Sequence, residues 1–458
     1  MAISNKILMI NPDWTGIGRQ KQPQFKRIWQ PLGLAIAAAL LEKEGFFVKI
    51  IDNNISRLSP LEIGKFSAGF DKVFVTSTPY DRWQCPSLDI KFFFDAIEHI
   101  LPEKLYIMGA HVTERPETIL KKSRARAAVL HEPEQTILEI ARRDVSRQMP
   151  PDIRGIAYIK DNRLVRTSSM GYLNDLDNLP YPAFHLLDMG KYFYEFMGEN
   201  FTVMEGSRGC PFQCSFCYLG MYGTRFRQKS IKRLVDETVY VTNRFNIKNI
   251  YFMDLEFGLN RGRFLLFCEE LTRQKLDIKW CCQTRVTDVD GKALQKMKES
   301  GCTLIHFGVE AGVDRILSRT GKKITIADCK KAVSLARDTG IRTALFMNFG
   351  FPGETKEDME ATIDLAVRLN PTYAAFHMIV PFPGTRLAEQ IGLDPEAFPP
   401  DQYPHYNFAC HDLKLLKSML KKAYLKFYLR PLYLAGFAKR FSMSGFKQAK
   451  LFFRMFFK

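Results

Sequence analysis

The stretch Glu205-Gly-Ser-Arg-Gly-Cys-Pro-Phe-Gln-Cys-Ser-Phe-Cys-Tyr218 places three cysteines, Cys210, Cys214 and Cys217, within eight residues. Thiolates at such short spacing are the soft ligands that iron–sulfur clusters use. Three thiolates leave one iron of a [4Fe–4S] cube without a protein ligand, and a substrate or cofactor can bind at an open metal position. The stretch therefore predicts a [4Fe–4S] cluster. A zinc knuckle with a distant fourth ligand and a loop that binds no metal are the alternatives.

The composition is that of an intracellular enzyme. With 458 residues the chain is long enough for two or three domains. Its ten cysteines do not form an even, spaced framework, and no signal peptide opens the chain, so we expect a reducing, cytoplasmic compartment. No uninterrupted apolar run reaches the length of a membrane span. These features argue against a secreted disulfide scaffold.

Strands and helices alternate over the first part of the chain, which predicts a parallel, Rossmann-like sheet with helices on both faces. Ligands of such sheets bind beyond the carboxyl ends of the strands. No GxGxxG motif is present, so a dinucleotide site is not indicated. We expect strands at 7–10, 48–52, 73–76, 105–108 and 127–130, and helices at 31–45, from 116 onward and after 136.

A second alternation follows the cysteine stretch and predicts six strand–helix units, most simply a partial, TIM-like (β/α)6 barrel. Active groups of such barrels lie at the carboxyl ends of the strands, and the cysteine loop follows the first strand of the set. We expect strands at 201–204, 249–253, 279–283, 303–307, 342–348 and 373–379, and helices at 230–245, 261–273, 291–299, 326–338 and 356–368.

The C-x3-C-x2-C spacing, with an aromatic residue on each side of the third cysteine, resembles the signature of the radical S-adenosylmethionine (SAM) enzymes. Pro31-Leu-Gly-Leu34, the loop 109–113 and the acidic turn 132–134 resemble the cobalamin-binding domain of one branch of them. This branch includes anaerobic magnesium-protoporphyrin monomethyl ester cyclases and cobalamin-dependent methyltransferases. The resemblance covers roughly residues 5–430. It implies a [4Fe–4S] cluster, SAM and cobalamin as cofactors, and a flavodoxin or ferredoxin as electron donor.

For SAM, the resemblance points to polar groups at the strand ends of the barrel. Glu310 and Glu256 offer carboxylates for the ribose hydroxyls or the ammonium group, Arg285 a cation for the SAM carboxylate, and Phe216 an apolar wall for adenine. The family resemblance favours Glu310 and Arg285 most. The alternative is that these charged side chains form ordinary ion pairs within the barrel rim.

For cobalamin, the resemblance points to residues at the carboxyl edge of the first sheet, namely Asn11, Thr76, Gly109, His111 and Glu132. None of the eight histidines has an aspartate two residues before it, so the Asp-x-His-x-x-Gly motif is absent. Within this branch that absence is common, and the resemblance implies cobalamin bound without a protein histidine on the cobalt. Two alternatives stay open: the domain is a fold relic without cobalamin, and His111 is a hydrogen-bonded structural residue.

These patterns divide the chain into four parts. We expect a cobalamin-binding-type domain at 1–145, a hairpin and linker at 146–195, a radical SAM barrel at 196–395 and a basic helical region at 396–458. From Asp412 to Lys458 only Asp412 is acidic, against twelve lysines and arginines. A basic helix with aromatic residues suits an anionic membrane surface, and we predict that these charges have no acidic partners. A helix that caps the barrel is the alternative; nucleic acid is disfavoured because no RNA-binding module is visible.

The remaining cysteines form no second trio, which argues against an auxiliary cluster and so against methylthiotransferases. Isolated cysteines are usually small core residues. Cys281 and Cys282 are adjacent on an expected strand, so only one of them can point into the barrel.

The resemblance implies that SAM is cleaved to a 5′-deoxyadenosyl radical, which takes a hydrogen atom before methylcobalamin delivers a methyl group. The sequence thus predicts C-methylation of an unactivated carbon in a lipid-like, tetrapyrrole or natural-product substrate. One alternative is radical cyclisation, rearrangement or oxidation without methyl transfer. Another is a non-catalytic iron–sulfur or corrinoid-binding protein.

Overall fold

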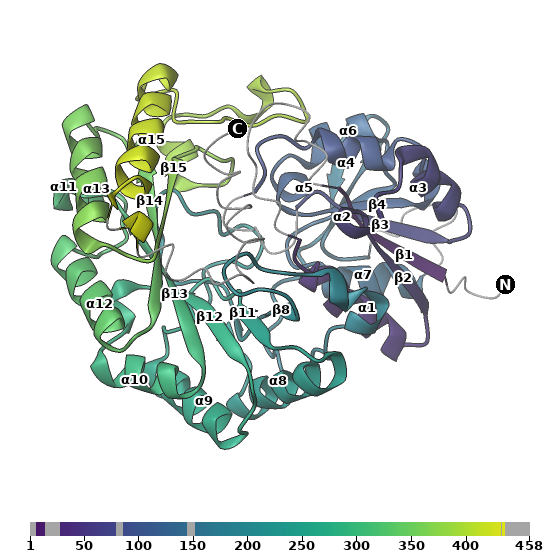
Figure 1. Ribbon diagram of the computed structural model, residues 1–458. Coiled ribbons are helices and arrows are strands. Elements are labelled where there is room, and N and C mark those ends of the chain that lie inside the picture. The colour runs from purple at the N-terminus through teal and green to yellow at the C-terminus, as the bar shows by residue number, and fades with distance from the viewer. Residues whose placement is uncertain (1–5, 14–27, 79–85, 144–151, 432, 436–458) are drawn as a thin grey trace.

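The computed structural model describes residues 6–13, 28–78, 86–143, 152–431 and 433–435. Two α/β halves lie side by side, each around its own sheet (Figure 1). The first sheet has the strand order β2-β1-β3-β4-β5-β6-β7, and the second has the order β15-β14-β13-β12-β11-β8. The predicted fold class, a Rossmann-like half followed by a partial (β/α)6 barrel, is confirmed.

The first sheet is parallel from β1 to β5, and a hairpin extends it. Strands β6 and β7 run antiparallel beyond β5, and Asp161 and Asn162 form the turn with left-handed backbone angles (φ 49° and 60°). The strands are β1 (Lys6–Asn11), β2 (Phe47–Asp52), β3 (Lys72–Thr76), β4 (Leu105–Met108), β5 (Ala127–Val129), β6 (Ile156–Lys160) and β7 (Arg163–Arg166). The helices are α1 (Leu32–Lys43), α2 (Asn53–Ser56), α3 (Pro60–Ser67), α4 (Lys91–Ile97), α5 (Ala110–Glu114), α6 (Pro116–Ser123) and α7 (Glu134–Arg142).

The second sheet is parallel throughout, and its helices cover the outer face of the curved sheet (Figure 1). Its strands are β8 (Phe201–Met204), β11 (Asn249–Phe252), β12 (Lys279–Thr284), β13 (Cys302–Glu310), β14 (Arg342–Phe349) and β15 (Tyr373–Met378). Its helices are α8 (Ile231–Phe245), α9 (Arg261–Arg273), α10 (Gly291–Glu299), α11 (Asp314–Arg319), α12 (Ile326–Asp338), α13 (Lys356–Leu369), α14 (Arg386–Gln390) and α15 (Leu413–Tyr428). Cys281 and Cys282 on β12 are both fully buried, because helices cover the strand face that points away from the barrel.

The chain after the barrel returns to the first half. Ile90 donates a backbone hydrogen bond to the carbonyl of Asp401, and Tyr403 donates one to the carbonyl of Leu88. The buried guanidinium of Arg115, at the start of α6, donates to the carbonyls of residues 398 and 399. The segment 398–403, which follows β15 in the chain, therefore connects the barrel to the first half.

Helix α15 caps the barrel, which corrects part of the prediction for the basic region. Its apolar side packs on β15 and α13. Lys422 and Lys426 are paired with Glu360 and Asp364 of α13, respectively. The expectation of unpaired charges was wrong here, because the acidic partners lie about sixty positions earlier in the sequence. The predicted aromatic run at 436–458 lies outside the described residues. No helix in the described part of the chain is both long enough and apolar enough to cross a bilayer.

Candidate functional site

The cysteine loop leaves the barrel directly after β8 and is closed at its base by a short antiparallel ribbon. Strand β9 (Ser207–Arg208) pairs with β10 (Arg227–Gln228), and Cys210 donates a backbone hydrogen bond to the carbonyl of Gly223 (3.3 Å). Gly209 has φ +74°, and a Cβ added there would lie 2.2 Å from the carbonyl oxygen of Arg225. Only glycine fits this close approach of two backbones.

Asp254, just beyond β11, holds the entry to this loop. Its carboxylate accepts from the backbone N–H of Gly206 (2.9 Å) and from the hydroxyl of Ser207. Burial raises the pKa of Asp254 to about 6, and these two donors oppose the rise. Further along the loop, Ser215 donates its N–H to Thr320 O (2.8 Å) and accepts from Leu387 N–H (2.7 Å). The loop is thus held by segments that follow three different strands.

The three thiols are half-buried and spread around the loop. No three His, Cys, Asp or Glu side chains within the described ranges lie close enough to share a single metal ion. A zinc site needs such convergence, whereas each thiolate of a cubane cluster binds a different iron. Burial raises the pKa of Cys210 to about 11 and also raises that of Cys214, where nearby Lys322 and Arg285 oppose the rise. The donor set and its cationic surroundings fit a cluster of thiolate-bound irons.

Glu310, the last residue of β13, is the centre of a buried polar group. Its two carboxylate oxygens accept from the Lys322 ammonium and the Asn348 amide. Its backbone is left-handed (φ +69°) at an irregularity in the pairing of β13 with β14. Burial alone would lower the pKa of Lys322, but the Glu310 carboxylate raises it, so Lys322 stays charged. Lys322 follows helix α11, and sequence reasoning missed it because nothing in the sequence indicates that it reaches Glu310.

Arg285, directly after β12, lies above the base of the loop. Its guanidinium lies 3.8 Å from the centre of the Phe212 ring and donates to the carbonyl of Lys322. The Nε atom is buried without a hydrogen-bond partner among the described residues. Glu256 accepts from the backbone N–H of Arg285 (3.0 Å) and the hydroxyl of Thr284 (2.5 Å), and burial raises its pKa to about 8. Arg285 and Glu310 thus share Lys322 as a partner on the cysteine side of the barrel.

Phe216, between the second and third cysteines, packs edge-on against Phe351 with 5.6 Å between the ring centres. Phe351 belongs to the Gly-Phe-Pro-Gly turn that follows β14. The structure therefore places two packed aromatic rings beside the cysteines, and the role of Phe216 as a wall for adenine stays a prediction.

A small pocket lies at the carboxyl edge of the first sheet. It is mainly apolar, and Met221 of the cysteine loop forms part of its wall, so the pocket joins the two halves. Its lining residues are Pro31, Gly33, Leu34, Thr76, Thr78, Met108, Gly109, Pro133 and Met221. At Gly109 (φ +110°) a Cβ would lie 2.5 Å from the Thr78 hydroxyl, so the backbones can approach closely only without a side chain.

Of the five residues predicted to contact cobalamin, Thr76 and Gly109 line this pocket. Asn11 is buried at the end of β1, where its amide donates to Asp52 (3.1 Å). His111 is fully buried, and its ring nitrogens lie 3.2 Å from the Ser77 hydroxyl and 2.7 Å from a backbone carbonyl. Burial lowers its pKa to about 4. These contacts match the alternative interpretation of His111 as a hydrogen-bonded structural residue.

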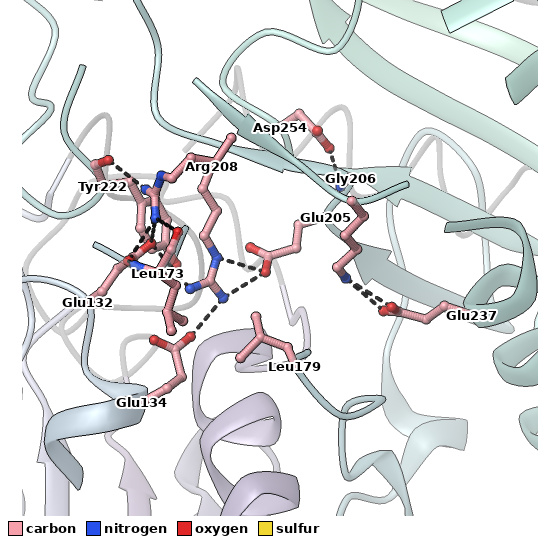
Figure 2. Close-up of polar contacts among 12 residues, drawn as sticks. Glu132, Glu134, Leu173, Leu179, Glu205, Gly206, Arg208, Tyr222, Glu237 and Asp254 are labelled. Atoms are coloured by element: carbon pink, nitrogen blue, oxygen red, sulfur yellow. Dashed lines mark hydrogen bonds and ion pairs between the residues drawn. The ribbon is translucent and has the colours of Figure 1, made fainter. Parts of the chain in front are cut away.

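Glu132 faces the cysteine loop. Its carboxylate accepts from Arg227 (2.7 and 2.8 Å), from Arg208 (3.3 Å) and from the backbone N–H of Leu173 (2.7 Å). Figure 2 shows Arg208 between the carboxylates of Glu132, Glu134 and Glu205. The sequence singled out Glu132, but nothing in the sequence indicated these partners.

Known proteins are similar to this chain in sequence and in fold. A model of the radical SAM superfamily matches residues 204–366. An uncharacterized methyltransferase of Pyrococcus horikoshii is 32% identical over 417 residues, which cover 88% of each chain. An anaerobic magnesium-protoporphyrin IX monomethyl ester cyclase of Rubrivivax gelatinosus is 27% identical over 97% of this chain and 83% of the cyclase.

Among solved structures, the fold is similar to that of TsrM from Kitasatospora setae, a radical S-adenosylmethionine methyltransferase with cobalamin and a [4Fe–4S] cluster bound. The TM-score is 0.68 at 20% identity, over 85% of this chain and 75% of TsrM. At this level of identity the likeness concerns the fold.

Proposed function

Because this chain belongs to the radical SAM enzymes with an N-terminal cobalamin-binding domain, we propose that it methylates an unactivated carbon of a small molecule with a [4Fe–4S] cluster, SAM and cobalamin. The observation that carries the proposal is the pocket at the edge of the first sheet, which is walled by Met221 of the cysteine loop. A cofactor in that pocket would lie next to the cluster loop. When bound, the cluster and SAM supply a radical and the corrinoid supplies a methyl group.

In this proposal Cys210, Cys214 and Cys217 bind three irons and leave the fourth open for SAM. The paired Lys322 and Glu310, together with Arg285, would orient the polar groups of SAM. A flavodoxin or ferredoxin would supply the electron. The buried positions of Lys322, Glu310 and Arg285 support their roles in orienting SAM, because charge-assisted hydrogen bonds are stronger away from water.

A second candidate is radical chemistry without methyl transfer, such as ring formation. It is favoured by the cyclase of Rubrivivax gelatinosus, which matches over 97% of this chain. Lipid-like, tetrapyrrole and natural-product carbons all suit radical chemistry because they carry no acidic proton. Each of these substrate classes therefore needs its own arm in the experiment.

The test is anaerobic reconstitution with iron, sulfide and hydroxocobalamin, followed by incubation with a reductant and methyl-deuterated SAM. Cell lipid extract, a porphyrin mixture and the small-molecule fraction serve as separate substrate pools, and products are found by mass spectrometry. A deuterated methyl group in a product supports methyl transfer, whereas 5′-deoxyadenosine with an unmethylated product favours the second candidate. The matched control is Cys210→Ala/Cys214→Ala/Cys217→Ala, which should bind almost no iron.

We also propose that the region after α15 attaches the enzyme to the periphery of an anionic membrane. Residues 436–458 contain six lysines or arginines, seven phenylalanines and no acidic residue. A basic residue near an acidic leaflet contributes about 1 kcal/mol, and aromatic side chains add apolar burial at the headgroups. A lipid-like substrate would then be within reach of the enzyme.

A further inference from the structure

Both ends of the cysteine loop are attached to one turn of the first half. Arg208 lies two residues before Cys210, and Arg227 pairs with Arg208 across the β9–β10 ribbon. Both guanidiniums contact the carboxylate of Glu132, which lies in the turn between β5 and α7. A single carboxylate from the first sheet thus joins the entry and the exit of the loop.

This group of charges is fully enclosed. The side chains of Glu132, Arg208 and Arg227 are each at most 2% exposed. Glu134 and Glu205 also contact Arg208, and the rings of Tyr222 and Tyr172 face the guanidiniums of Arg208 and Arg227. We call Glu132, Glu134, Glu205, Arg208 and Arg227 the loop-anchor network (Figure 2).

Stability alone is a poor explanation for such a network. Removing charges from water costs about as much as their attraction returns, so well-packed apolar residues would often hold the same interface as firmly. The network also contains three carboxylates but only two guanidiniums, and Glu134 Oε2 is buried without a hydrogen-bond partner among the described residues. Directional arginine contacts do, however, fix geometry. The network is better suited to hold the loop in one position.

The same turn borders the pocket. Pro133, between Glu132 and Glu134, lines the pocket on the side of the first sheet, and Met221 lines it on the side of the cysteine loop. Arg227 donates to the carbonyl of Tyr222, the neighbour of Met221 (2.8 Å). A ligand in the pocket would therefore contact Pro133, next to Glu132 and Glu134, and Met221, next to the residue that Arg227 holds.

We propose that Glu132 is a positioning residue that couples the pocket to the cysteine loop, so that a ligand in the pocket and the cluster in the loop stabilise each other's binding. This inference rests on the proposed function in that it takes the pocket ligand to be a corrinoid. Coupling of this kind is reciprocal: the cluster must raise corrinoid affinity by the same factor by which the corrinoid raises cluster affinity.

Glu132→Gln tests the inference, because it keeps the size of the side chain and removes the charge that both arginines contact. The matched control is Glu237→Gln. Glu237 forms a buried pair with Lys229 (2.9 Å), two residues beyond Arg227, and among the described residues its ion-pair partners, Lys229 and Arg233, both belong to the second half. Arg227→Lys serves as a second test variant, since it keeps the charge and loses the forked geometry.

The first measurement is hydrogen exchange of residues 209–226 in protein without cluster or corrinoid. We expect at least tenfold faster exchange in Glu132→Gln than in Glu237→Gln. Equal exchange in these two variants, with Arg227→Lys at the wild-type rate, would overturn the role of Glu132 in positioning. This measurement decides that role even if the wild type retains no corrinoid, a result that would refute the proposed function.

The second measurement is the affinity for hydroxocobalamin with and without the reconstituted cluster. We expect the cluster to tighten binding at least fivefold in the wild type and in Glu237→Gln, and to change it less than twofold in Glu132→Gln. The same ratio in Glu132→Gln as in the wild type, or a wild-type ratio of one, would overturn the coupling. Intact coupling without any methylated product would instead count against the proposed function alone.

Discussion

Replacing Gly209 by alanine should open the base of the cysteine loop. The residue has φ +74°, where a side chain costs roughly 1–2 kcal/mol. A Cβ there would also lie 2.2 Å from the carbonyl oxygen of Arg225, which is part of the backbone and cannot rotate away. Relief of the clash should separate β9 from β10 and break the hydrogen bond from Cys210 to Gly223.

The free energy by which Gly209→Ala favours opening of the loop follows from the contacts that would be lost. One or two hydrogen bonds at about 1 kcal/mol each add to the backbone strain, which gives a total of about 3 kcal/mol for local opening. Gly171→Ala is the matched control, because Gly171 has φ +75° and no atom within 4 Å of an added Cβ. Gly171→Ala shares the backbone strain but not the clash, so the two variants should differ by the one or two lost hydrogen bonds, about 1–2 kcal/mol.

The assay is hydrogen exchange of segment 205–230 in cluster-free protein, together with iron content after reconstitution. A difference of about 1–2 kcal/mol predicts roughly 5- to 30-fold faster exchange in Gly209→Ala than in Gly171→Ala. We also expect Gly209→Ala to retain less than half of the wild-type iron. Equal exchange in both variants, with normal iron, would show that the two backbones do not approach as closely as described.

Three further outcomes are expected. Glu310→Gln should weaken SAM binding at least tenfold with the iron content unchanged; unchanged affinity in equilibrium dialysis would show that Glu310 and Lys322 form only a rim ion pair. Burial lowers the pKa of His111 to about 4, against an ordinary 6.5, so unfolded chains take up this proton first. The free energy of unfolding should therefore fall as the pH drops from about 6.5 to about 4, and His111→Phe should flatten that part of the profile. Full-length protein should float with anionic liposomes at low salt and a version ending at residue 435 should not; equal behaviour would remove the proposed membrane contact.

Much of the fold could be predicted because local signals agree with the tertiary structure. The expected strand at 201–204 and the expected helices at 261–273, 291–299 and 326–338 have the same bounds in the structure, and the other expected barrel strands and helices differ by a few residues. Strand β13 runs on to Glu310, beyond its expected end at 307. Apolar strands buried on both faces and capped helices leave a strong periodic pattern in the sequence.

Partners of charged residues could not be predicted, because they depend on how distant segments meet. Arg208 and Glu132 are 76 positions apart, and Lys422 and Glu360 are 62 positions apart. The sequence singled out Glu132 and the lysines of α15 as unusual, but it contained no signal for the arginines or carboxylates that face them. Lys322 was missed for the same reason, since it reaches Glu310 only after the turn beyond α11 folds back.

The barrel is open, and side chains from outside it pair with the backbone of its two edge strands, β8 and β15. Unpaired backbone groups at a sheet edge attract other chains. At β8, the buried amide of Gln30 donates to Phe201 O (2.7 Å) and accepts from Val203 N–H (3.3 Å). At β15, the hydroxyls of Tyr424 and Tyr428 each bridge the N–H and C=O of one residue.

The spacing of Tyr424 and Tyr428 along α15 explains how this helix can pair with the edge of β15. Residues four apart on a helix are separated by about 6.0 Å along its axis, and residues two apart on a strand by about 6.6 Å. Tyr424 and Tyr428 therefore match Phe376 and Ala374, the two residues whose backbone groups point out of the same edge. Gln30 belongs to the first half and α15 to the region after the barrel, so a fragment limited to 196–395 would expose both edges. The barrel half thus depends on the rest of the chain for the hydrogen-bond partners of its edge strands and for the anchoring of its cysteine loop.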